Sequence, residues 1–519
     1  MDEESIEEEL ERRTPLLVSA SESEPSYIME GLPAEVHVSQ HDIHIPKVLL
    51  TGANIVNADT MMVGDMLIGD GKILAIQPEI KPTPDVEEVL DVRGMYILPG
   101  GIDPHTHFDF EFMGTKTIDD FFTGTRAAVR GGTTTIIDFI VPYKDESLAA
   151  AYDRYMKKAE GNAVCDFAFH MAITKWNESI SKEMQNICMI NKINSFKMFM
   201  AYKDTLMVND SDLYRIFYRC KTLGALPMVH AENGLLIAEM AKRLIERGIT
   251  GPEGHEISRP EEVEEEATNR ACVIANQVGC PLYVVHVMSD SAANVIAKQR
   301  ANGKRIYGEA IAAGLGSTGA PKGASFKEVA AHVMSPPIRR DPQNKRKLMQ
   351  HLALDNLSCV GSDNCTFTTD QKEKLGKNCF TDIPNGVNGV EERMCVVYRF
   401  GIEEKILSYK DFVRITSTNA AKLFNLYPKK GCLAVGSDAD IVVWNPCKIT
   451  RMSSETHKSS TDFNIFEGVE AMGGPEYVIV RGLFCVRGDK FKVVKGFGRY
   501  APTLPFSPEV YTKENADSD

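Results

Sequence analysis

Eight short apolar runs alternate with helix-like stretches through the middle of the chain, and this alternation constrains the fold more than any other feature. Alternating strands and helices indicate βα units and a parallel sheet. Eight units over residues 99–427 match a TIM-like (β/α)8 barrel of the α/β class. The runs are Met95–Ile102, Thr134–Phe139, Phe167–Ile173, Ser195–Met200, Pro227–His230, Leu282–His286, Arg305–Glu309 and Leu357–Gly361.

A second, β-rich texture occurs on both sides of this region. Residues 47–98 contain short apolar runs with an Asp70-Gly71 pair between two of them, which is a hairpin signal. A similar texture returns over residues 428–495. We therefore predict one small, discontinuous β-sandwich domain built from both ends of the chain.

The two ends beyond these regions differ in composition. Residues 1–46 are polar and rich in acidic residues, so we expect this segment to be a tail without fixed structure. Residues 496–519 are expected to form a C-terminal tail.

The helical stretch that starts at Pro260 has glutamates in its first turn, where the helix dipole favours acids. We expect those glutamates to face solvent.

The bulk composition excludes several classes of partner. The net charge of −14 argues against nucleic acid. No apolar stretch is long enough to span a membrane, and no secretory signal is recognisable. The twelve cysteines contain no C-x-x-C pair, which is typical of reduced thiols and predicts a cytoplasmic protein.

Ligand-type side chains stand where several of the predicted strands end. In a closed parallel barrel the carboxyl ends of the strands share one rim, so these side chains would meet there. His105-Thr-His107 puts two imidazoles on one side of an extended strand, and imidazole suits zinc. The sequence therefore predicts a metal site formed by His105, His107, Lys197, His230, His286 and Asp363.

Lys197 is the unusual member, because an ammonium group has no lone pair for a metal. Burial near cations favours the neutral amine, which can add CO2 to give a carbamate able to bridge two metal ions. An ordinary ion-paired lysine is the alternative. Asp363 is placed to act as a general base towards activated water, and Tyr202 either donates to a developing oxyanion or packs at the rim.

Gly314-Leu-Gly-Ser-Thr-Gly319 matches a G-x-G-x-x-G pattern by letter only. A nucleotide-binding fingerprint needs a helix directly after it, and here a proline- and glycine-rich stretch follows instead. We expect residues 314–325 to form a flexible loop over the barrel mouth.

Several segments are highly specific to one family. They include Pro-Gly-Gly-Ile-Asp-Pro-His-Thr-His, Ser-Phe-Lys-Met-Phe-Met-Ala-Tyr-Lys, His-Ala-Glu-Asn-Gly, Ser-Asp-Asn-Cys-Thr-Phe and Ile-Pro-Asn-Gly-Val-Asn-Gly-Val-Glu. Over about residues 47–500 the chain resembles the dihydropyrimidinase and hydantoinase branch of the amidohydrolase superfamily.

The resemblance implies a homotetrameric enzyme that opens 5,6-dihydrouracil and dihydrothymine to N-carbamoyl-β-amino acids. It implies two Zn2+ ions per subunit bridged by carboxylated Lys197 (N6-carboxylysine). One zinc would take His105, His107 and Asp363, and the other His230 and His286. The implied substrate contacts are Tyr202, the main chain at Ser335, and Asn385.

Two other readings remain. Collapsin response mediator proteins look like this branch but have lost metal ligands and act as adaptors, whereas all six ligand positions here hold suitable residues. Sister enzymes such as hydantoinases, allantoinases and dihydroorotases are the second alternative. Dihydroorotases typically carry an arginine two residues after the second histidine, and Asp109 stands there in this chain. The stretch from Gly319 to Ser325 departs from the branch and makes the substrate preference an open question.

Overall fold

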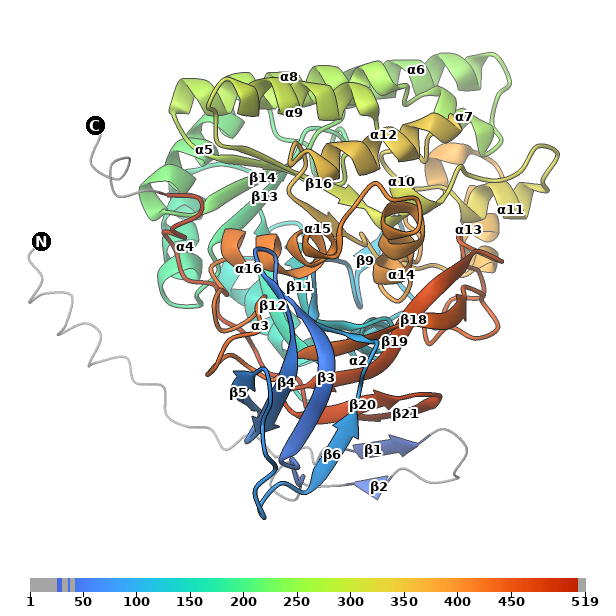
Figure 1. Cartoon of the computed structure of the whole chain (residues 1–519). Helices are drawn as coiled ribbons and strands as arrows, with labels where there is room; N and C mark the ends of the chain where they lie inside the picture. The colour runs from blue at the N-terminus through green and yellow to red at the C-terminus, as the bar shows by residue number, and fades with distance from the viewer. Residues whose placement is uncertain (1–25, 30–35, 38–42, 512–519) are drawn as a thin grey trace, which may run out of the picture.

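The structure is a computed structural model that describes residues 26–29, 36–37 and 43–511. A parallel eight-stranded barrel lies at its centre, and helices surround it (Figure 1). Neighbouring strands are hydrogen-bonded in the order β17-β16-β15-β14-β13-β12-β11-β8. These strands are β8 (Gly101–Thr106), β11 (Thr133–Ile140), β12 (Asp166–Ala172), β13 (Ser195–Phe199), β14 (Leu226–His230), β15 (Leu282–Val284), β16 (Ile306–Ile311) and β17 (Cys359–Gly361). The predicted (β/α)8 barrel is confirmed.

The ring closes where the last strand meets the first. The main-chain N–H of Asp363 donates to the His105 carbonyl at 2.9 Å, and the His107 N–H donates to the Asn364 carbonyl at 2.9 Å. This closure brings the end of β17 beside the end of β8. Residues about 260 positions apart along the chain thereby become direct neighbours at the rim.

Helices cover the outside of the barrel, and their ends follow local sequence signals. Asp120 and Thr123 form a capping box at the start of α2, and Gly224 ends α5 in the left-handed conformation. The helices are α2 (Phe121–Arg130), α3 (Leu148–Ala159), α4 (Glu178–Met189), α5 (Asp210–Leu223), α6 (Gly234–Glu246), α7 (Glu253–Ile257), α8 (Glu261–Val278), α9 (Asp290–Ala301), α10 (Ala312–Gly316), α11 (Phe326–Ala331), α12 (Pro342–Ala353), α13 (Thr369–Gly376), α14 (Arg393–Val397), α15 (Tyr409–Val413) and α16 (Asn419–Leu423). Short non-α turns are η2 (Phe380–Asp382), η3 (Tyr398–Ile402) and η4 (Arg414–Thr418).

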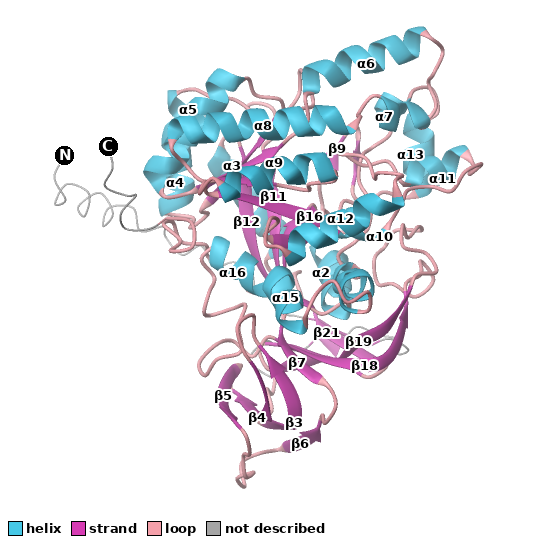
Figure 2. Cartoon of the chain, turned by 45° about the horizontal axis from the view of Figure 1, so that its top comes forward, coloured by secondary structure: helices cyan, strands magenta, loops and turns pink. Residues whose placement is uncertain are grey.

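A separate sheet lies at one end of the barrel (Figure 2). Its strands come from both ends of the chain, as predicted, but they form one continuous eleven-stranded sheet and not two separate ones. Its path is β2-β1-β21-β20-β19-β18-β7-β3-β4-β5, with β6 beside β3. The strands are β1 (Ser26–Met29), β2 (Val36–His37), β3 (Val48–Val56), β4 (Met61–Gly69), β5 (Lys72–Gln77), β6 (Glu88–Asp91), β7 (Tyr96–Pro99), β18 (Ile441–Arg451), β19 (Glu470–Val480), β20 (Leu483–Arg487) and β21 (Lys490–Val494).

Two details of this sheet bear on the sequence predictions. Asp70 and Gly71 both have positive φ, at 52° and 73°, and they join β4 to β5 as the predicted hairpin turn. The run Met95–Ile102, predicted as one barrel strand, is divided: β7 pairs with β18 in the outer sheet, and the barrel begins only at Gly101.

The predictions for the two tails need correction. Within residues 1–46, the segments 26–29 and 36–37 form β1 and β2, because β1 adds to the edge of the outer sheet along β21. Residues 1–25, 30–35 and 38–42 lie outside the described residues, as do residues 512–519. Residues 496–511 pack on the barrel: the Phe506 N–H donates to the Gly224 carbonyl at 2.8 Å, and the Tyr511 hydroxyl donates to the Ala225 carbonyl at 2.6 Å.

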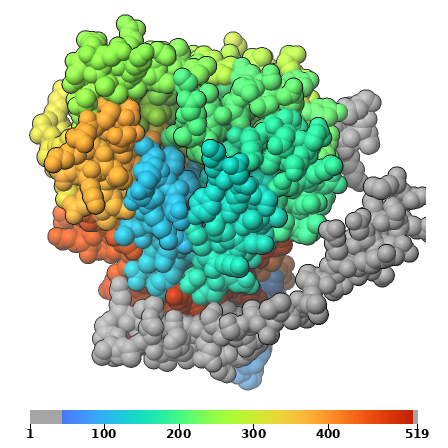
Figure 3. Space-filling view, turned by 180° about the vertical axis from the view of Figure 1, so that it is seen from behind, coloured from blue at the N-terminus to red at the C-terminus, as the bar shows by residue number. Residues whose placement is uncertain are grey.

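A small hairpin, β9 (Glu111–Phe112) with β10 (Thr115–Lys116), follows the first barrel strand. The Gln371 side-chain amide of α13 donates to Thr115 Oγ1 at 2.8 Å and to the Lys116 carbonyl at 2.9 Å. Early and late segments of the chain, blue and orange, accordingly lie side by side in the view from behind (Figure 3). Among the described helices, none is both long and apolar enough to cross a membrane.

Candidate metal centre and substrate pocket

The carboxyl ends of five barrel strands bring the six predicted ligand residues to one place. His105 lies near the end of β8, Lys197 within β13, and His230 at the last position of β14. His286 and Asp363 each stand two residues beyond a strand, with φ of 39° and 52°. A positive φ is strained for residues with a side chain, and such strain can be retained where it directs a functional side chain. All six side chains are buried.

One group of ligand atoms gathers around the Asp363 carboxylate. His105 Nε2 lies 3.1 Å and His107 Nε2 lies 3.4 Å from Asp363 Oδ1. Lys197 Nζ lies 3.2 Å from His105 Nε2. His105, His107 and Asp363 are close enough together to hold a single ion. Lys197 borders this group.

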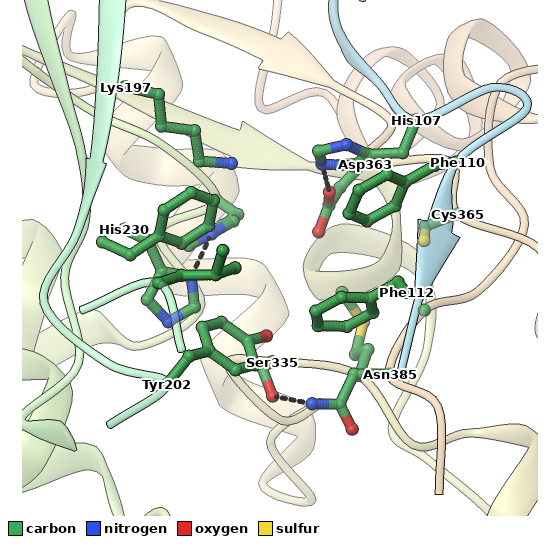
Figure 4. A pocket seen from close by; sticks show the side chains of 15 residues that line it. His107, Phe110, Phe112, Lys197, Tyr202, His230, Ser335, Asp363, Cys365 and Asn385 are labelled. Atoms are coloured by element: carbon green, nitrogen blue, oxygen red, sulfur yellow. Dashed lines mark hydrogen bonds and ion pairs between the residues drawn. The ribbon is translucent and has the colours of Figure 1, made fainter. Parts of the chain in front are cut away.

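A second pair of ligand atoms lies across the pocket. His230 Nδ1 and His286 Nε2 are 2.8 Å apart. Figure 4 shows His230 on the side of the pocket opposite His107 and Asp363. Without a cation only one proton can sit between two such nitrogens, whereas a metal ion satisfies both lone pairs. His286 Nδ1 is buried and has no hydrogen-bond partner among the described residues. The donor set therefore fits divalent metal of the zinc type at both positions.

Two carboxylates outside the predicted set orient these histidines. Glu309 Oε1 accepts from His105 Nδ1 at 2.6 Å and from the His286 main-chain N–H at 3.1 Å. Glu232 Oε2 accepts from His230 Nε2 at 2.8 Å and from Arg259 Nη1 at 2.7 Å. Such contacts fix which ring nitrogen carries the proton and leave the other free for a metal. The sequence did not predict a role for either glutamate. Glu309 ends a predicted strand, and Glu232 lies two residues beyond another.

Burial sets the protonation of the central groups. Burial lowers the pKa of Lys197 to about 8, although the Asp363 and Glu309 carboxylates oppose the shift. Burial alone would raise the pKa of Asp363, but the charge of His105 and hydrogen bonds from both neighbouring histidines hold it well below its usual value. The site thus combines an amine that is easily made neutral with a carboxylate that stays ionised.

The ligand cluster forms the floor of a pocket with about 450 Å³ of empty space (Figure 4). Its walls are mostly apolar and include Phe110, Phe112, Phe199, Leu206 and Met334. The polar groups on the wall opposite the floor are the three predicted substrate contacts, namely Tyr202, Ser335 and Asn385.

These three polar residues lie close together. Asn385 Nδ2 donates to Ser335 Oγ at 3.0 Å. Tyr202 has a φ of 64°, and burial raises the pKa of its phenol to about 12, so it remains a hydrogen-bond donor at neutral pH. The structure therefore brings together every residue that the sequence singled out for the site.

The prediction for residues 314–325 is wrong in part. Gly314 and Gly316 belong to the buried helix α10, where side chains of Met288 and Phe466 leave no space for a Cβ atom. No residue of 314–325 belongs to the described lining of the metal-site pocket. The stretch that departs from the branch thus supplies no residue to the pocket walls.

Comparison with known proteins agrees with this geometry. A family model described as the amidohydrolase family matches residues 96–484. The chain belongs to the amidohydrolase family. Dihydropyrimidinase of Rattus norvegicus is 49% identical over 471 residues, which are 90% of this chain and 91% of the rat protein. A solved D-hydantoinase from Bacillus sp. AR9 is similar with a TM-score of 0.85 and 41% identity, covering 89% of this chain and 100% of that one.

These findings confirm the predicted branch, that of dihydropyrimidinases and hydantoinases, and with it a hydrolase of cyclic amides. A protein named dihydropyrimidinase-related protein 5, from Mus musculus, is also 42% identical over 90% of this chain and 83% of its own length. Overall identity therefore does not by itself assign a substrate, and the side chains of the site must carry that argument.

Proposed function

We propose that this protein is a zinc-dependent hydrolase that opens 5,6-dihydrouracil and dihydrothymine to N-carbamoyl-β-amino acids. The observation that carries the proposal is the convergence of six ligand-type side chains at a small, otherwise uncharged pocket: five of them line it, and His105 lies directly behind Asp363 and Lys197. A pocket of this kind holds a neutral ring and exposes one of its amide bonds to a metal site.

Two zinc ions and a carbamate complete the proposed site. Zinc there would polarise the ring carbonyl and lower the pKa of water towards neutrality. The lowered pKa of Lys197 supports carboxylation by CO2 to N6-carboxylysine, because the neutral amine is the reacting form. The proposed holders are His105, His107 and Asp363 for one zinc, His230 and His286 for the other, and carboxylated Lys197 between them.

The remaining steps fall to side chains of known protonation. Asp363 is ionised at neutral pH, so it can accept a proton and pass it to the leaving ring nitrogen. The protonated Tyr202 phenol can donate to the oxyanion that develops on the attacked carbonyl. The main chain of Ser335 and the Asn385 side chain would bind the polar edge of the ring; both residues line the pocket, which supports this role.

The pocket favours a neutral ring over an acidic one. Among the described residues of its lining there is no arginine, and the single lysine is Lys197. A dihydroorotate carboxylate would therefore lack a cation to bind. Asp109 lies outside this lining and forms ion pairs with Lys116 and, at 3.8 Å, with Lys158, so it contributes little repulsion of its own.

The decisive test is the loss of ultraviolet absorbance when purified, zinc-supplemented protein is incubated with dihydrouracil, beside hydantoin and dihydroorotate. We expect the fastest turnover with dihydrouracil, none with dihydroorotate, and two zinc ions per chain. A clear preference for hydantoin would move the assignment to a hydantoinase, and protein free of zinc and activity would favour the adaptor reading.

We further propose a homotetramer in the cytoplasm. Exposed apolar side chains on the consecutive helices α5 and α6, such as Tyr214, Tyr218, Leu235 and Leu236, support contacts between subunits. All twelve cysteines are free thiols, and eleven of them are at least partly buried, which fits a reducing compartment. Light scattering of the purified protein tests the tetramer.

A further inference from the structure

One buried lysine lies outside the metal site and has no carboxylate partner. Lys372 of α13 is 1% exposed, and no described acidic group forms an ion pair with it. Burial lowers its pKa to about 7, whereas hydrogen bonds to three carbonyl oxygens favour its charged form. Its ammonium group donates instead to three main-chain carbonyls: Ala331 at 3.1 Å, Val333 at 2.8 Å and Gly386 at 2.6 Å. An unpaired buried charge is costly, so a full set of three strong acceptors calls for an explanation.

The three acceptors belong to two separate segments, and each segment carries one of the polar wall residues of the pocket, Ser335 or Asn385. Ala331 and Val333 lie four and two residues before Ser335, and Gly386 directly follows Asn385. The Val333 carbonyl also accepts from the Gly386 N–H at 3.0 Å. A single ammonium group therefore ties together the two chain segments whose side chains meet in the Asn385–Ser335 hydrogen bond.

A second donor holds the same segment from its other side. His255 Nε2 lies 2.8 Å from the Met334 carbonyl, and burial lowers the pKa of His255 to about 3, so the ring is neutral and donates from this nitrogen. The carbonyls of residues 331, 333 and 334 are thus all occupied by donors of the protein. The main-chain N–H of Ser335 has no acceptor among the described residues, which leaves it available to a ligand.

We propose that Lys372 is a positioning residue for substrate binding: it fixes Ser335 and Asn385 in the arrangement that receives the polar edge of a neutral cyclic amide. The inference deepens the proposed function and rests on it. An ammonium group suits this task because its three N–H bonds diverge towards three acceptors, whereas a methionine of similar length offers none.

The helix that carries Lys372 is held by contacts that do not involve this lysine. Thr368 caps its start, and the Thr369 N–H and hydroxyl donate to Asp462 at 2.9 and 2.6 Å. Gln371 binds the β9–β10 hairpin. Replacing Lys372 should therefore leave α13 in place and release only the two pocket segments.

The experiment compares Lys372→Met with Lys374→Met in the zinc-loaded, full-length protein. Lys374 is exposed two residues further along the same helix, so it controls for the loss of a lysine from α13. For Lys372→Met we expect KM for dihydrouracil to rise about 10-fold or more, kcat to change less than about threefold, and zinc content to stay at the parent value. Lys374→Met should keep both parameters.

A folded Lys372→Met protein with KM within about twofold of the parent overturns the inference, and so does a loss confined to kcat or accompanied by loss of zinc. If Lys372→Met does not fold, Lys372→Gln, which keeps a neutral donor, is judged by the same KM criterion. Failure of the parent and of Lys374→Met to hydrolyse any cyclic amide would instead refute the proposed function, so the two failures are distinguishable.

Discussion

Replacing Glu309 by glutamine should weaken zinc binding more than any other single change outside the ligands themselves. Glu309 is fully buried beneath the site. One of its oxygens accepts from His105 Nδ1 and from the His286 N–H, and the other accepts from the Tyr283 hydroxyl at 2.8 Å. A glutamine amide at this position has no charge, so His105 would donate to a neutral oxygen, and the NH2 group would require the Tyr283 hydroxyl to turn from donor to acceptor.

The expected magnitude follows from the hydrogen bond to His105. A buried hydrogen bond to a charged group contributes about 1.5–3 kcal/mol, which corresponds to roughly a 10- to 150-fold change in an equilibrium constant. Loss of a carboxylate that orients a histidine ligand typically lowers metal affinity about 10- to 100-fold. We expect Glu309→Gln to reduce zinc affinity at the His105 position by that factor. The His286 position should lose less, because only its main chain contacts Glu309.

The assay is a titration of metal-free protein with zinc against a chelator of known affinity. Tyr283→Phe is the matched control, since it removes one hydrogen bond to Glu309 and leaves the contact with His105 intact. It should weaken zinc binding less than about threefold. Parent-like zinc affinity in Glu309→Gln, or an equal loss in both variants, would refute the assignment of an orienting role to this carboxylate.

Three further outcomes are expected. Lys197→Ala should abolish turnover, and short carboxylic acids that imitate the carbamate should restore part of it; full activity without them would exclude a bridging role. Asp363→Asn should lower kcat at least about 100-fold while much of the zinc remains, as metal analysis and steady-state kinetics can show, and unchanged turnover would exclude proton transfer by this residue. In the metal-free protein the pKa of Lys197 is about 8 against 10.5 for an ordinary lysine, so the unfolded chain binds more protons in this interval. Lys197 therefore lowers the stability of the folded protein below pH 8. The free energy of unfolding of Lys197→Met should exceed that of the parent there, and this difference should shrink as pH rises from 8 to 10.5. A difference that stays constant in denaturant unfolding would contradict burial as the cause of the lowered pKa.

The barrel was predictable from the alternation of apolar runs with helical stretches. The candidate ligand residues were predictable from their positions at the ends of the predicted strands. Apolar runs of strand length mark the barrel, and closure of the barrel then gathers any side chain at a strand end. The division of the run Met95–Ile102 was not predictable. The Gly100 N–H donates at 2.8 Å to the main-chain carbonyl of Asp440, directly before β18 of the outer sheet, and the Gly101 N–H donates at 2.9 Å to the carbonyl of Gly132, directly before β11 of the barrel. Two apolar strands in direct succession look like one, since periodicity does not say which sheet each strand joins.

Buried charged residues other than the predicted metal ligands were not foreseen from the sequence. The glutamates of α8 were expected to face solvent, yet Glu264 is 2% exposed, because Arg339 binds it at 2.7 Å and the Met288 N–H donates to it. Glu309 and Lys372 are of the same kind. A charged residue is buried only where partners from distant segments meet it, and those partners become visible only once the chain is folded.

The cost of the site argues that a cation belongs to the folded protein. His286, Asp363 and Tyr202 all adopt positive φ, and each such residue costs on the order of 1 kcal/mol or more. His230 and His286 direct ring nitrogens at each other. Burial of Lys197 disfavours the charged form of its amine. A chain without use for metal would be more stable with apolar side chains at these positions. A ligand that binds only the folded state adds stability. Zinc should therefore raise the unfolding temperature of this protein, and removal of zinc should lower it.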